Sequence, residues 1–319
     1  MVRHDAFGSP APMLAELEAL VQAESPSADD DLTASAARLV DDLFLQHLGS
    51  RGRWIADGAR GHLLWSGGGE VKVLLVGHVD TVWPVGTTGR WPFSVNDDHA
   101  TGPGCFDMKA GLVQGIHALK ELGDLEGVAF IVTTDEEVGS PTSRALIEQT
   151  ATGARAALVL EPSADAALKS VRKGVSMYQL VVHGRAAHAG LEPERGANAA
   201  VELSHQVLAM LDLADLSQAT TVTPTLMSAG TTTNTVPAMA SVAVDVRAVD
   251  VAEQGRVDGA LRSLVARTPG TSLELRGGIN RPPLAATASK DLLIRARRIA
   301  DELGLPPLLD VAVGGGSDG

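Results

Sequence analysis

The sequence VKVLLVGHVD at positions 71–80 joins a largely apolar run to a glycine, and then to His78 and Asp80. An apolar run of this length that is bounded by glycine is typical of a central strand buried on both faces of a sheet. Polar residues directly after such a strand lie at its carboxyl end, where open α/β sheets hold their ligands. The segment therefore predicts a buried strand, Val71–Val76, that brings an imidazole and a carboxylate to one edge of a sheet.

The same arrangement recurs twice further along the chain. An apolar strand predicted over Val128–Thr133 is followed by Thr134-Asp135-Glu136-Glu137, and one over Ala156–Leu160 by Glu161-Pro162. Helical spacing of apolar residues separates these strands, so the pattern predicts a layered α/β domain. The other elements expected in it are a strand over Gly61–Trp65 and helices over Ala11–Ala23, Asp30–Leu48, Asp107–Leu122 and Pro141–Gln149.

The order of elements changes after Lys173. Strands and helices then follow as β-α-β-β-α-β, the split motif that forms a four-stranded sheet with two helices on one face. We therefore expect an inserted α+β, ferredoxin-like domain at 174–280, while 1–173 and 281–319 form the layered α/β domain around a central mixed sheet. The elements expected in the insert are Val175–Val182, Gly196–Leu213, Thr220–Ser228, Ser241–Ala248, Val251–Ala266 and Thr271–Arg276, and a helix over Ser289–Leu303 follows it.

Composition restricts the classes of protein to consider. The 319 residues carry a formal net charge of -13 and a single cysteine, Cys105. An acidic surface repels phosphate backbones, so nucleic acid is not expected as a partner. One cysteine excludes an intrachain disulfide, and the sequence shows neither the apolar core of a signal peptide nor an unbroken apolar run that could span a membrane. The expectation is a cytoplasmic protein without a membrane partner.

Imidazole and carboxylate groups gather at the predicted sheet edge. Together they form a borderline-to-hard ligand set that suits zinc, manganese or cobalt. Asp80 follows His78 closely enough to hold the second nitrogen of a metal-bound imidazole. Two adjacent carboxylates, Glu136 and Glu137, repel each other at the end of a buried strand unless a cation or a proton compensates. The pattern therefore favours a metal site in which one of the two binds the metal and the other acts as a base.

Structural roles remain as alternatives for the same residues. Glu136 and Glu137 could begin a helix, where acidic side chains are favoured. Asp107 could cap the helix that it precedes, and Glu161 could be a turn residue before a proline. A lone His78 could be a satisfied core histidine, but the carboxylate loops at matching strand ends make a metal site the better hypothesis.

Several motifs, taken in order, resemble those of one enzyme family. They are Gly-His-Val-Asp-Thr-Val at 77–82, Gly-Pro-Gly-Cys-Phe-Asp-Met-Lys-Ala-Gly at 102–111, Thr-Asp-Glu-Glu-Val-Gly at 134–139, Glu-Pro at 161–162, Ala-His-Ala-Gly at 187–190, Asn-Thr-Val-Pro at 234–237 and Asp-Val-Arg at 245–247. The set resembles, over nearly the whole chain, the dinuclear zinc metallopeptidases that include glutamate carboxypeptidase, acetylornithine deacetylase, succinyl-diaminopimelate desuccinylase and aminoacylase. The glutamate carboxypeptidase branch looks closest, from the Glu161-Pro162 pair and the stretch 230–237.

The resemblance implies a zinc centre of two ions, for which cobalt or manganese could substitute. His78 and Glu161 would bind one ion, Glu137 would bind the other, and Asp107 would bridge them. Glu136 would be the general base, which takes a proton from a metal-bound water and passes it to the leaving nitrogen. Asp80 would orient the histidine ligand.

The resemblance also implies substrate contacts outside the metal centre. His188 would stabilise the oxyanion, and Arg247 and Asn234 would hold a substrate carboxylate. Gly315 and Gly316 belong to a glycine-rich loop, 314–318, that would line the substrate pocket. An exposed loop histidine and a surface ion pair are the structural alternatives for His188 and Arg247.

The activity that follows is hydrolysis of the amide bond of an N-acyl amino acid, or of the C-terminal residue of a short peptide. An aminopeptidase that uses the same metal core is one alternative, and a non-catalytic relative that binds ligand or dimerises is another. The inserted domain is implied to act as a lid and to form a homodimer.

One ligand of the family pattern is not found in this sequence. The family's second zinc takes a further histidine close to the C-terminus, whereas none of the nine histidines here lies beyond His205. We therefore expect the chain to be a fragment or a truncated gene product, with weakened binding of the second ion and an exposed edge in the sheet of the first domain.

Overall fold

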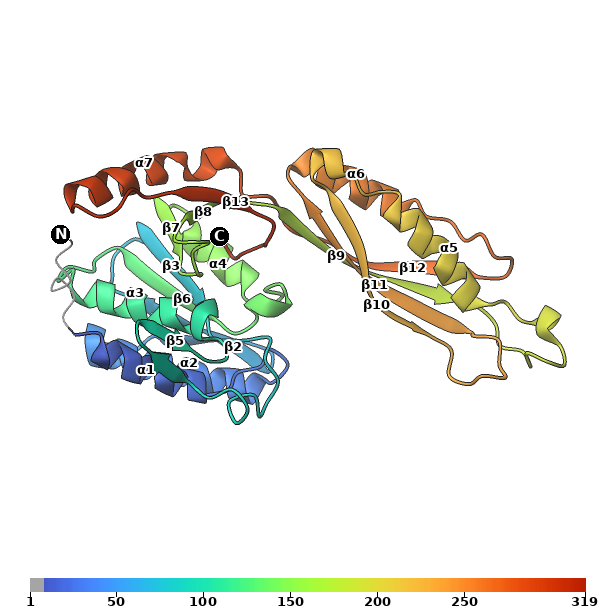
Figure 1. The fold of residues 1–319 in the computed structure, drawn as a ribbon, viewed down its shortest axis with the longest axis horizontal. Helices are drawn as coiled ribbons and strands as arrows, with labels where there is room; N and C mark the ends of the chain where they lie inside the picture. The colour runs from blue at the N-terminus through green and yellow to red at the C-terminus, as the bar shows by residue number, and fades with distance from the viewer. Residues whose placement is uncertain (1–8) are drawn as a thin grey trace. The chain divides into compact units, whose positions relative to one another are not determined.

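The computed structural model describes residues 9–319, which form two compact units (Figure 1). The first unit contains the chain up to Ala167 together with Ile294–Leu309 and Ser317–Gly319. The second contains Leu168–Leu293 and Asp310–Gly316. Among the described residues, no helix has both the length and the apolar character needed to cross a bilayer.

A mixed sheet forms the centre of the first unit, as the sequence predicts, and it has five strands, of which β1 was not expected. Its order is β1-β2-β6-β3-β7, in which β1, β2 and β6 pair antiparallel while β6, β3 and β7 run parallel. The three parallel strands therefore end at the same edge of the sheet. The strands are β1 (Arg53–Asp57), β2 (Arg60–Ser66), β3 (Val73–His78), β6 (Val128–Thr133) and β7 (Ala156–Val159).

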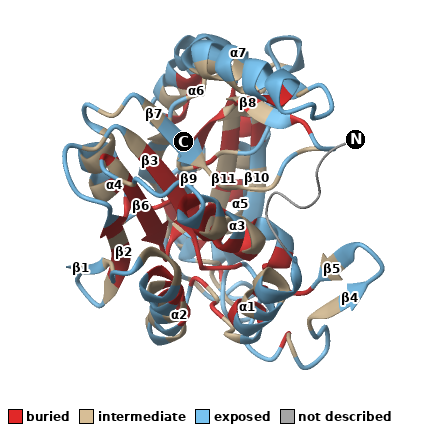
Figure 2. Ribbon diagram, turned by 90° about the vertical axis from the view of Figure 1, so that its left-hand side faces the viewer, coloured by how far each residue is buried: buried red, intermediate tan, exposed pale blue. Residues whose placement is uncertain are grey.

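Alternation along β3 and β6 divides their side chains between two cores. Leu75 and Phe130 face a cluster that is shared with three helices, whereas Leu74 and Ile131 face a second cluster that includes Ile147. Both strands are buried along nearly their whole length, as Figure 2 shows in red. The three helices are α1 (Ala11–Gln22), α2 (Asp30–Leu48) and α3 (Ala110–Lys120), and Ile147 belongs to α4 (Arg144–Ala151).

Helix α2 shows how local sequence sets the ends of an element. The Asp29 carboxylate accepts a hydrogen bond from the Leu32 amide at 3.0 Å, which caps the first turn. Gly49, with φ of 79°, ends the helix in the left-handed region that glycine adopts without strain. Apolar residues at helical spacing then bury one face of α2, on which Val40 and Phe44 are fully buried.

The second unit has the β-α-β-β-α-β order predicted from the sequence. Its antiparallel sheet has the order β10-β11-β9-β12, and apolar residues of α5 and α6 share one core with it. The elements are β9 (Gly174–His183), α5 (Ala199–Leu211), β10 (Thr221–Ala229), β11 (Met239–Ala248), α6 (Val251–Arg262) and β12 (Ser272–Arg281).

Two pairs of short strands, which the sequence did not predict, and the predicted helix after the insert complete the chain. A parallel pair joins β8 to β13, and an antiparallel hairpin joins β4 to β5. These strands are only three to five residues long, which is too short for a clear alternating pattern. The elements are β4 (Ser94–Asn96), β5 (His99–Thr101), β8 (Leu168–Arg172), α7 (Ala286–Glu302) and β13 (Asp310–Val313).

Four helix starts differ from prediction by three residues, two of them beside the site, and one strand is less buried than predicted. The helix expected from Asp107 begins at Ala110, because Asp107 and Met108 have non-helical backbone angles. The helix expected from Pro141 begins at Arg144, since Asp135 holds the preceding turn. Strand β7 is apolar, yet it lies at the sheet edge and leaves Leu158 45% exposed.

Candidate metal centre

Strand β3 delivers His78 to the carboxyl edge of the sheet. The imidazole is 2% exposed, and its Nδ1 lies 2.9 Å from the main-chain oxygen of Asp80. Because a carbonyl oxygen only accepts, Nδ1 carries the hydrogen and Nε2 faces outward. Nε2 lies 3.3 Å from the Asp107 carboxylate, so the ring presents the nitrogen that a metal would bind next to a second ligand.

The Asp80 carboxylate organises the turn that carries the two glutamates. One of its oxygens accepts the Glu136 amide and the other accepts the Glu137 amide, each at 3.1 Å. Ser27 donates a further hydrogen bond to the carboxylate at 2.7 Å. From the sequence, the Asp80 carboxylate is expected at the second nitrogen of His78. The structure instead brings that nitrogen to the Asp80 carbonyl oxygen, with the nearest carboxylate oxygen 3.5 Å away.

Asp107 lies in the segment η2 (Cys105–Lys109), between Gly104 and helix α3. Asp107 does not cap α3, because the residue directly before that helix is Lys109. Its side chain is half exposed, and a carboxylate oxygen faces His78. Cys105 in the same segment is buried, which raises the pKa of its thiol and supports a packing role.

Three side chains meet with the geometry of a metal site. His78, Asp107 and Glu137 each offer one ligand atom, and these atoms all lie within 4.8 Å of one another. Glu137 belongs to the short turn η3 (Glu136–Val138), which follows β6. The fold therefore brings Asp107 and Glu137 to His78, although they lie 29 and 59 residues from it in sequence.

Electrostatics at this edge favour a bound cation. Burial, with the carboxylates of Asp107, Asp80 and Glu161, raises the pKa of Glu137 to about 7, although His78 opposes the shift. Burial lowers the pKa of His78, but hydrogen bonds to Asp107 and Asp80 outweigh it and raise that pKa well above its ordinary value. The site thus holds more negative charge than its one imidazole balances, and its donor set fits zinc, cobalt or manganese.

Two of the predicted site residues lie close to this group without belonging to it. Glu161 follows β7, and its negative charge contributes to the raised pKa of Glu137. Glu136 precedes Glu137 in η3, and its charge contributes to the raised pKa of His78. The carboxyl edge of the sheet therefore gathers every residue that the sequence assigned to the metal centre.

A buried histidine supports the same turn and was not singled out from the sequence. His62 Nδ1 accepts the Thr134 amide at 3.3 Å, and Nε2 lies 3.0 Å from the Thr142 hydroxyl. That hydroxyl in turn donates to Asp135 at 2.7 Å. The arrangement requires neutral His62, because a proton on Nδ1 would face the N–H of Thr134.

The structure therefore predicts an acid-sensitive contribution of His62 to stability. Burial lowers the pKa of His62 below its ordinary value of 6.5. Folding is then favoured by neutral His62 above that value, and this stability is lost as the pH falls from 6.5 towards the lower folded-state pKa. Urea unfolding of wild type and of His62→Gln at mildly acidic and neutral pH measures the difference. If acidification lowered the free energy of unfolding equally in wild type and in His62→Gln, the proposed role of His62 would be wrong.

In the second unit, His188 and Asn234 lie on neighbouring loops. His188 Nδ1 accepts the amides of Gly190 and Leu191, both at 3.1 Å, and the Ala189 amide donates to the Asn234 main-chain oxygen. Nδ1 therefore holds no hydrogen, and the neutral ring carries its hydrogen on Nε2. His188 is exposed, so it presents an N–H donor to its surroundings.

Arg247 and the glycine-rich loop lie elsewhere in the second unit. Arg247 forms two hydrogen bonds of 2.8 Å with Asp245, and Arg172 donates to the Gly316 oxygen at 2.8 Å. A Cβ atom placed on Gly316 would lie 3.6 Å from a guanidinium nitrogen of Arg247 and of Arg281. It would lie 2.5 Å from the Val175 side chain. Three arginines thus adjoin Gly316. A Cβ atom placed on Gly315 would lie 3.9 Å from a guanidinium nitrogen of Arg172.

The two groups of proposed substrate contacts lie at opposite ends of β11. Asn234 precedes Met239, the first residue of the strand, whereas Arg247 is next to its last. At about 3.3 Å per residue the eight steps from Met239 to Arg247 span roughly 26 Å. Asn234 and Arg247 of one chain therefore cannot hold the same carboxylate.

Two contributors were missed because their partners are distant in sequence. Ser27 lies just before helix α2, and its hydroxyl binds Asp80, 53 residues away in sequence. Arg172 is 7% exposed and binds Gly316, 144 residues away. No local pattern signals either contact.

The fold and this imidazole–carboxylate centre define a metallopeptidase or a related amide hydrolase. The family model described as "Peptidase family M20/M25/M40" matches residues 74–319. The chain belongs to this peptidase family.

Individual relatives agree with the family match. Carboxypeptidase G2 of Pseudomonas sp. (strain RS-16) is 32% identical over 322 residues, which cover 95% of this chain and 76% of that protein. Acetylornithine deacetylase of Myxococcus xanthus is 28% identical over 62% of this chain and 55% of its own. The M20 family metallo-carboxypeptidase Sso-CP2 of Sulfolobus solfataricus matches in structure with a TM-score of 0.74, at 15% identity, over 96% of this chain and 87% of its own.

Proposed function

We propose that the protein is a zinc-dependent carboxypeptidase or N-acyl-amino-acid hydrolase. The observation that carries this proposal is the meeting of His78, Asp107 and Glu137 within 4.8 Å at the sheet edge, beside Glu136. Carboxypeptidase G2 and acetylornithine deacetylase, both named for such activities, are among its relatives. We place the enzyme in the cytoplasm, where a chain with one cysteine needs no disulfide.

In the proposed mechanism, His78, Asp107, Glu137 and Glu161 would hold the metal, for which two ions are expected. Zinc held there would supply the positive charge that polarises the scissile carbonyl and makes water a better nucleophile. Glu136 accepts the proton of the attacking water and returns it to the leaving nitrogen. Asp80 keeps Glu136 in place by holding its main-chain amide at 3.1 Å.

The arginines around Gly316 favour a substrate with a free carboxylate. Arg172, Arg247 and Arg281 bring three guanidinium groups to this loop, and Arg247 also pairs with Asp245. An aminopeptidase would instead need an acidic group for the substrate amine. Solved relatives include an aminopeptidase of Bacillus cereus with a TM-score of 0.66 at 22% identity, which supports a shared fold and does not decide between the activities.

The test compares two sets of substrates on protein stripped of metal and then reconstituted with zinc. We expect hydrolysis of N-acyl amino acids and peptides with a C-terminal glutamate, and none of peptides whose C-terminus is amidated. Zinc analysis per chain accompanies the assay and is repeated on Asp107→Asn with Glu137→Gln, where a loss of about two ions relative to wild type supports the dinuclear centre. Cleavage of amidated peptides alone would favour the aminopeptidase alternative. Zinc-loaded protein that cleaves neither set would overturn the enzymatic proposal.

We further propose that the protein works as a homodimer formed through α5 and β10. Strand β10 is an edge of its sheet, and α5 packs beside it. Apolar side chains remain exposed on both, including Leu208 at 65% and Leu226 at 77%. Dimerisation would let His188 and Asn234 serve the site of the partner, which resolves their separation from Arg247.

Replacing Leu226 by glutamate is expected to weaken this dimer about tenfold or more, because it places a charge in an apolar contact. Sedimentation across a range of protein concentrations measures the dissociation constant. Leu122→Glu is the matched control, since Leu122 is 63% exposed in the first unit. A wild-type protein that sediments as a monomer at every concentration would contradict the dimer.

A further inference from the structure

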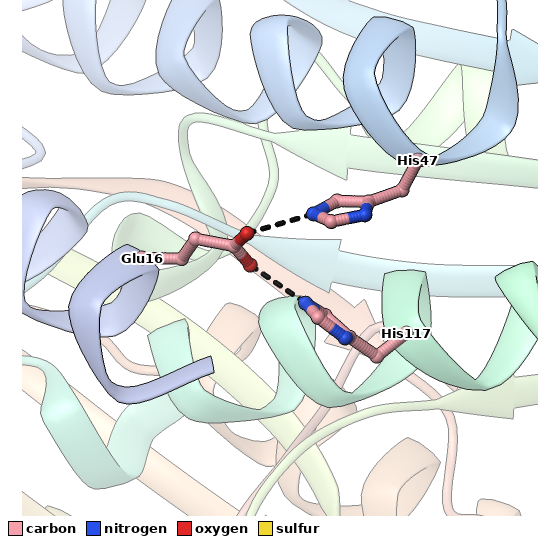
Figure 3. Close-up of side chains that lie close together, drawn as sticks. All are labelled: Glu16, His47 and His117. Carbon is pink, nitrogen blue, oxygen red and sulfur yellow. Dashed lines mark hydrogen bonds and ion pairs between the residues drawn. The ribbon is translucent and has the colours of Figure 1, made fainter. Parts of the chain in front are cut away.

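A second cluster of metal-ligating side chains lies among the three helices of the first unit. Glu16 projects from α1, His47 from the last turn of α2 and His117 from the last turn of α3 (Figure 3). One ligand atom from each lies within 4.8 Å of the others. None of these residues belongs to the centre at the sheet edge.

The carboxylate of Glu16 joins the two imidazoles. Its Oε1 lies 2.7 Å from His47 Nε2, and its Oε2 lies 2.7 Å from His117 Nε2 (Figure 3). The side chains of His47, Glu16 and His117 are 7%, 12% and 15% exposed. The two imidazole rings pack with their centres 4.5 Å apart. Both Nε2 atoms therefore converge on one carboxylate in a shielded position.

We propose that Glu16, His47 and His117 form a zinc site that ties α1, α2 and α3 together. Two imidazole nitrogens and one carboxylate oxygen are a ligand set of zinc, and a water can complete its tetrahedron. Ligand atoms around a tetrahedral zinc lie about 3.4 Å apart, so the present 2.7 Å contacts open by less than about 1 Å on binding. Rotation of the side chains supplies this change.

Metal binding at this cluster displaces protons and involves no redox step. A carboxylate only accepts hydrogen bonds, so each Nε2 donates a hydrogen to Glu16 before the metal binds. On binding, each Nε2 releases its hydrogen to solvent and gives its lone pair to the metal, while Nδ1 takes up a hydrogen from solvent, so that each ring stays neutral. Nothing is oxidised or reduced, and any excess proton passes to solvent.

Two surrounding features favour a cation at this position. His47 and His117 both lie in the last turns of their helices, where the exposed carbonyl groups and the helix dipole attract positive charge. The Gln46 amide lies 3.4 Å from Glu16 Oε1, where it can orient the carboxylate from outside the ligand set.

The proposed zinc site would act on the fold and not on the reaction. Glu16 lies 31 residues from His47 and 101 from His117, so one ion would cross-link distant parts of the chain. His117 is seven residues, or about 10 Å, along α3 from Ala110, at the end of the segment that carries Asp107. The inference does not depend on the proposed activity.

The experiment uses a background protein, Asp107→Asn with Glu137→Gln, in which the sheet-edge centre is disabled. Equilibrium dialysis against zinc is expected to load about one ion per background chain. Adding His47→Gln or His117→Gln is expected to weaken this binding by at least about 10-fold to 100-fold. His99→Gln, at a side chain 80% exposed, is the matched control and should change nothing.

A second readout avoids dependence on variants that fail to fold. Nitrogen NMR of the background protein should show zinc shifting the Nε2 signals of two histidines, and zinc should raise its melting temperature. A background protein that binds no zinc overturns the proposal. Zinc binding that is unchanged by Glu16→Gln and His47→Gln together also overturns it, and would leave the cluster as a hydrogen-bonded link between helices.

Discussion

Glu136→Gln is expected to lower kcat by about 10²-fold to 10⁴-fold while the protein keeps its metal. Glutamine matches the size of glutamate but cannot accept the proton of the attacking water. Glu136 is outside the group of His78, Asp107 and Glu137, so its replacement leaves those ligands in place. Steady-state kinetics on the best N-acyl amino acid, with zinc analysis of the same sample, measures both quantities.

The control for this experiment is Glu148→Gln, a glutamate whose side chain is 63% exposed on α4. It removes the same charge at an exposed position outside the turn η3 and should leave kcat unchanged. Unchanged turnover in Glu136→Gln would refute its role as a base. Loss of zinc from Glu136→Gln would instead assign it to the ligand set.

Asp80→Ala is expected to reduce both stability and activity more than any other single change near the site. The carboxylate is fully buried and accepts hydrogen bonds from Ser27, Glu136 and Glu137. Its removal leaves these donors unpaired and takes a charge partner from His78, which costs about 3–5 kcal/mol. Urea unfolding measures the loss of stability. Activity falls as well, because the turn that positions Glu136 loses its hydrogen bonds to Asp80.

Two milder variants separate the parts of this effect. Ser27→Ala removes one donor and is expected to cost about 1 kcal/mol. Asp80→Asn keeps one acceptor oxygen and should fall between Ser27→Ala and Asp80→Ala in stability. If Asp80→Ala unfolds at the same urea concentration as wild type, the carboxylate does not anchor the turn.

The sequence predicted those parts of the fold whose signals are local. Strands β3 and β6 are apolar and buried on both faces, and the polar residues after them lie at one edge because the strands run parallel. The mixed sheet and the peptidase family were therefore accessible from sequence alone. Strand β7 is just as apolar, but its place at the edge depends on pairing that composition does not record.

Contacts between segments that are distant in sequence could not be predicted from local patterns. Nothing near Ser27 indicates that it binds Asp80, and Glu16 is 101 residues from His117. Asp107 was expected to begin a helix because aspartate favours that position, but its backbone turns away to face His78. The roles of His188, Asn234, Arg247 and Gly316 stay predictions, with positions that the structure now defines.

The length of β11 has a consequence for genetics. If His188 of one chain serves the site of its partner, every site takes Glu136 from one chain and His188 from the other. A chain with Glu136→Gln and a chain with His188→Ala would each be inactive alone. Coexpressed, they would form mixed dimers with one intact site, so that two defective alleles would rescue each other.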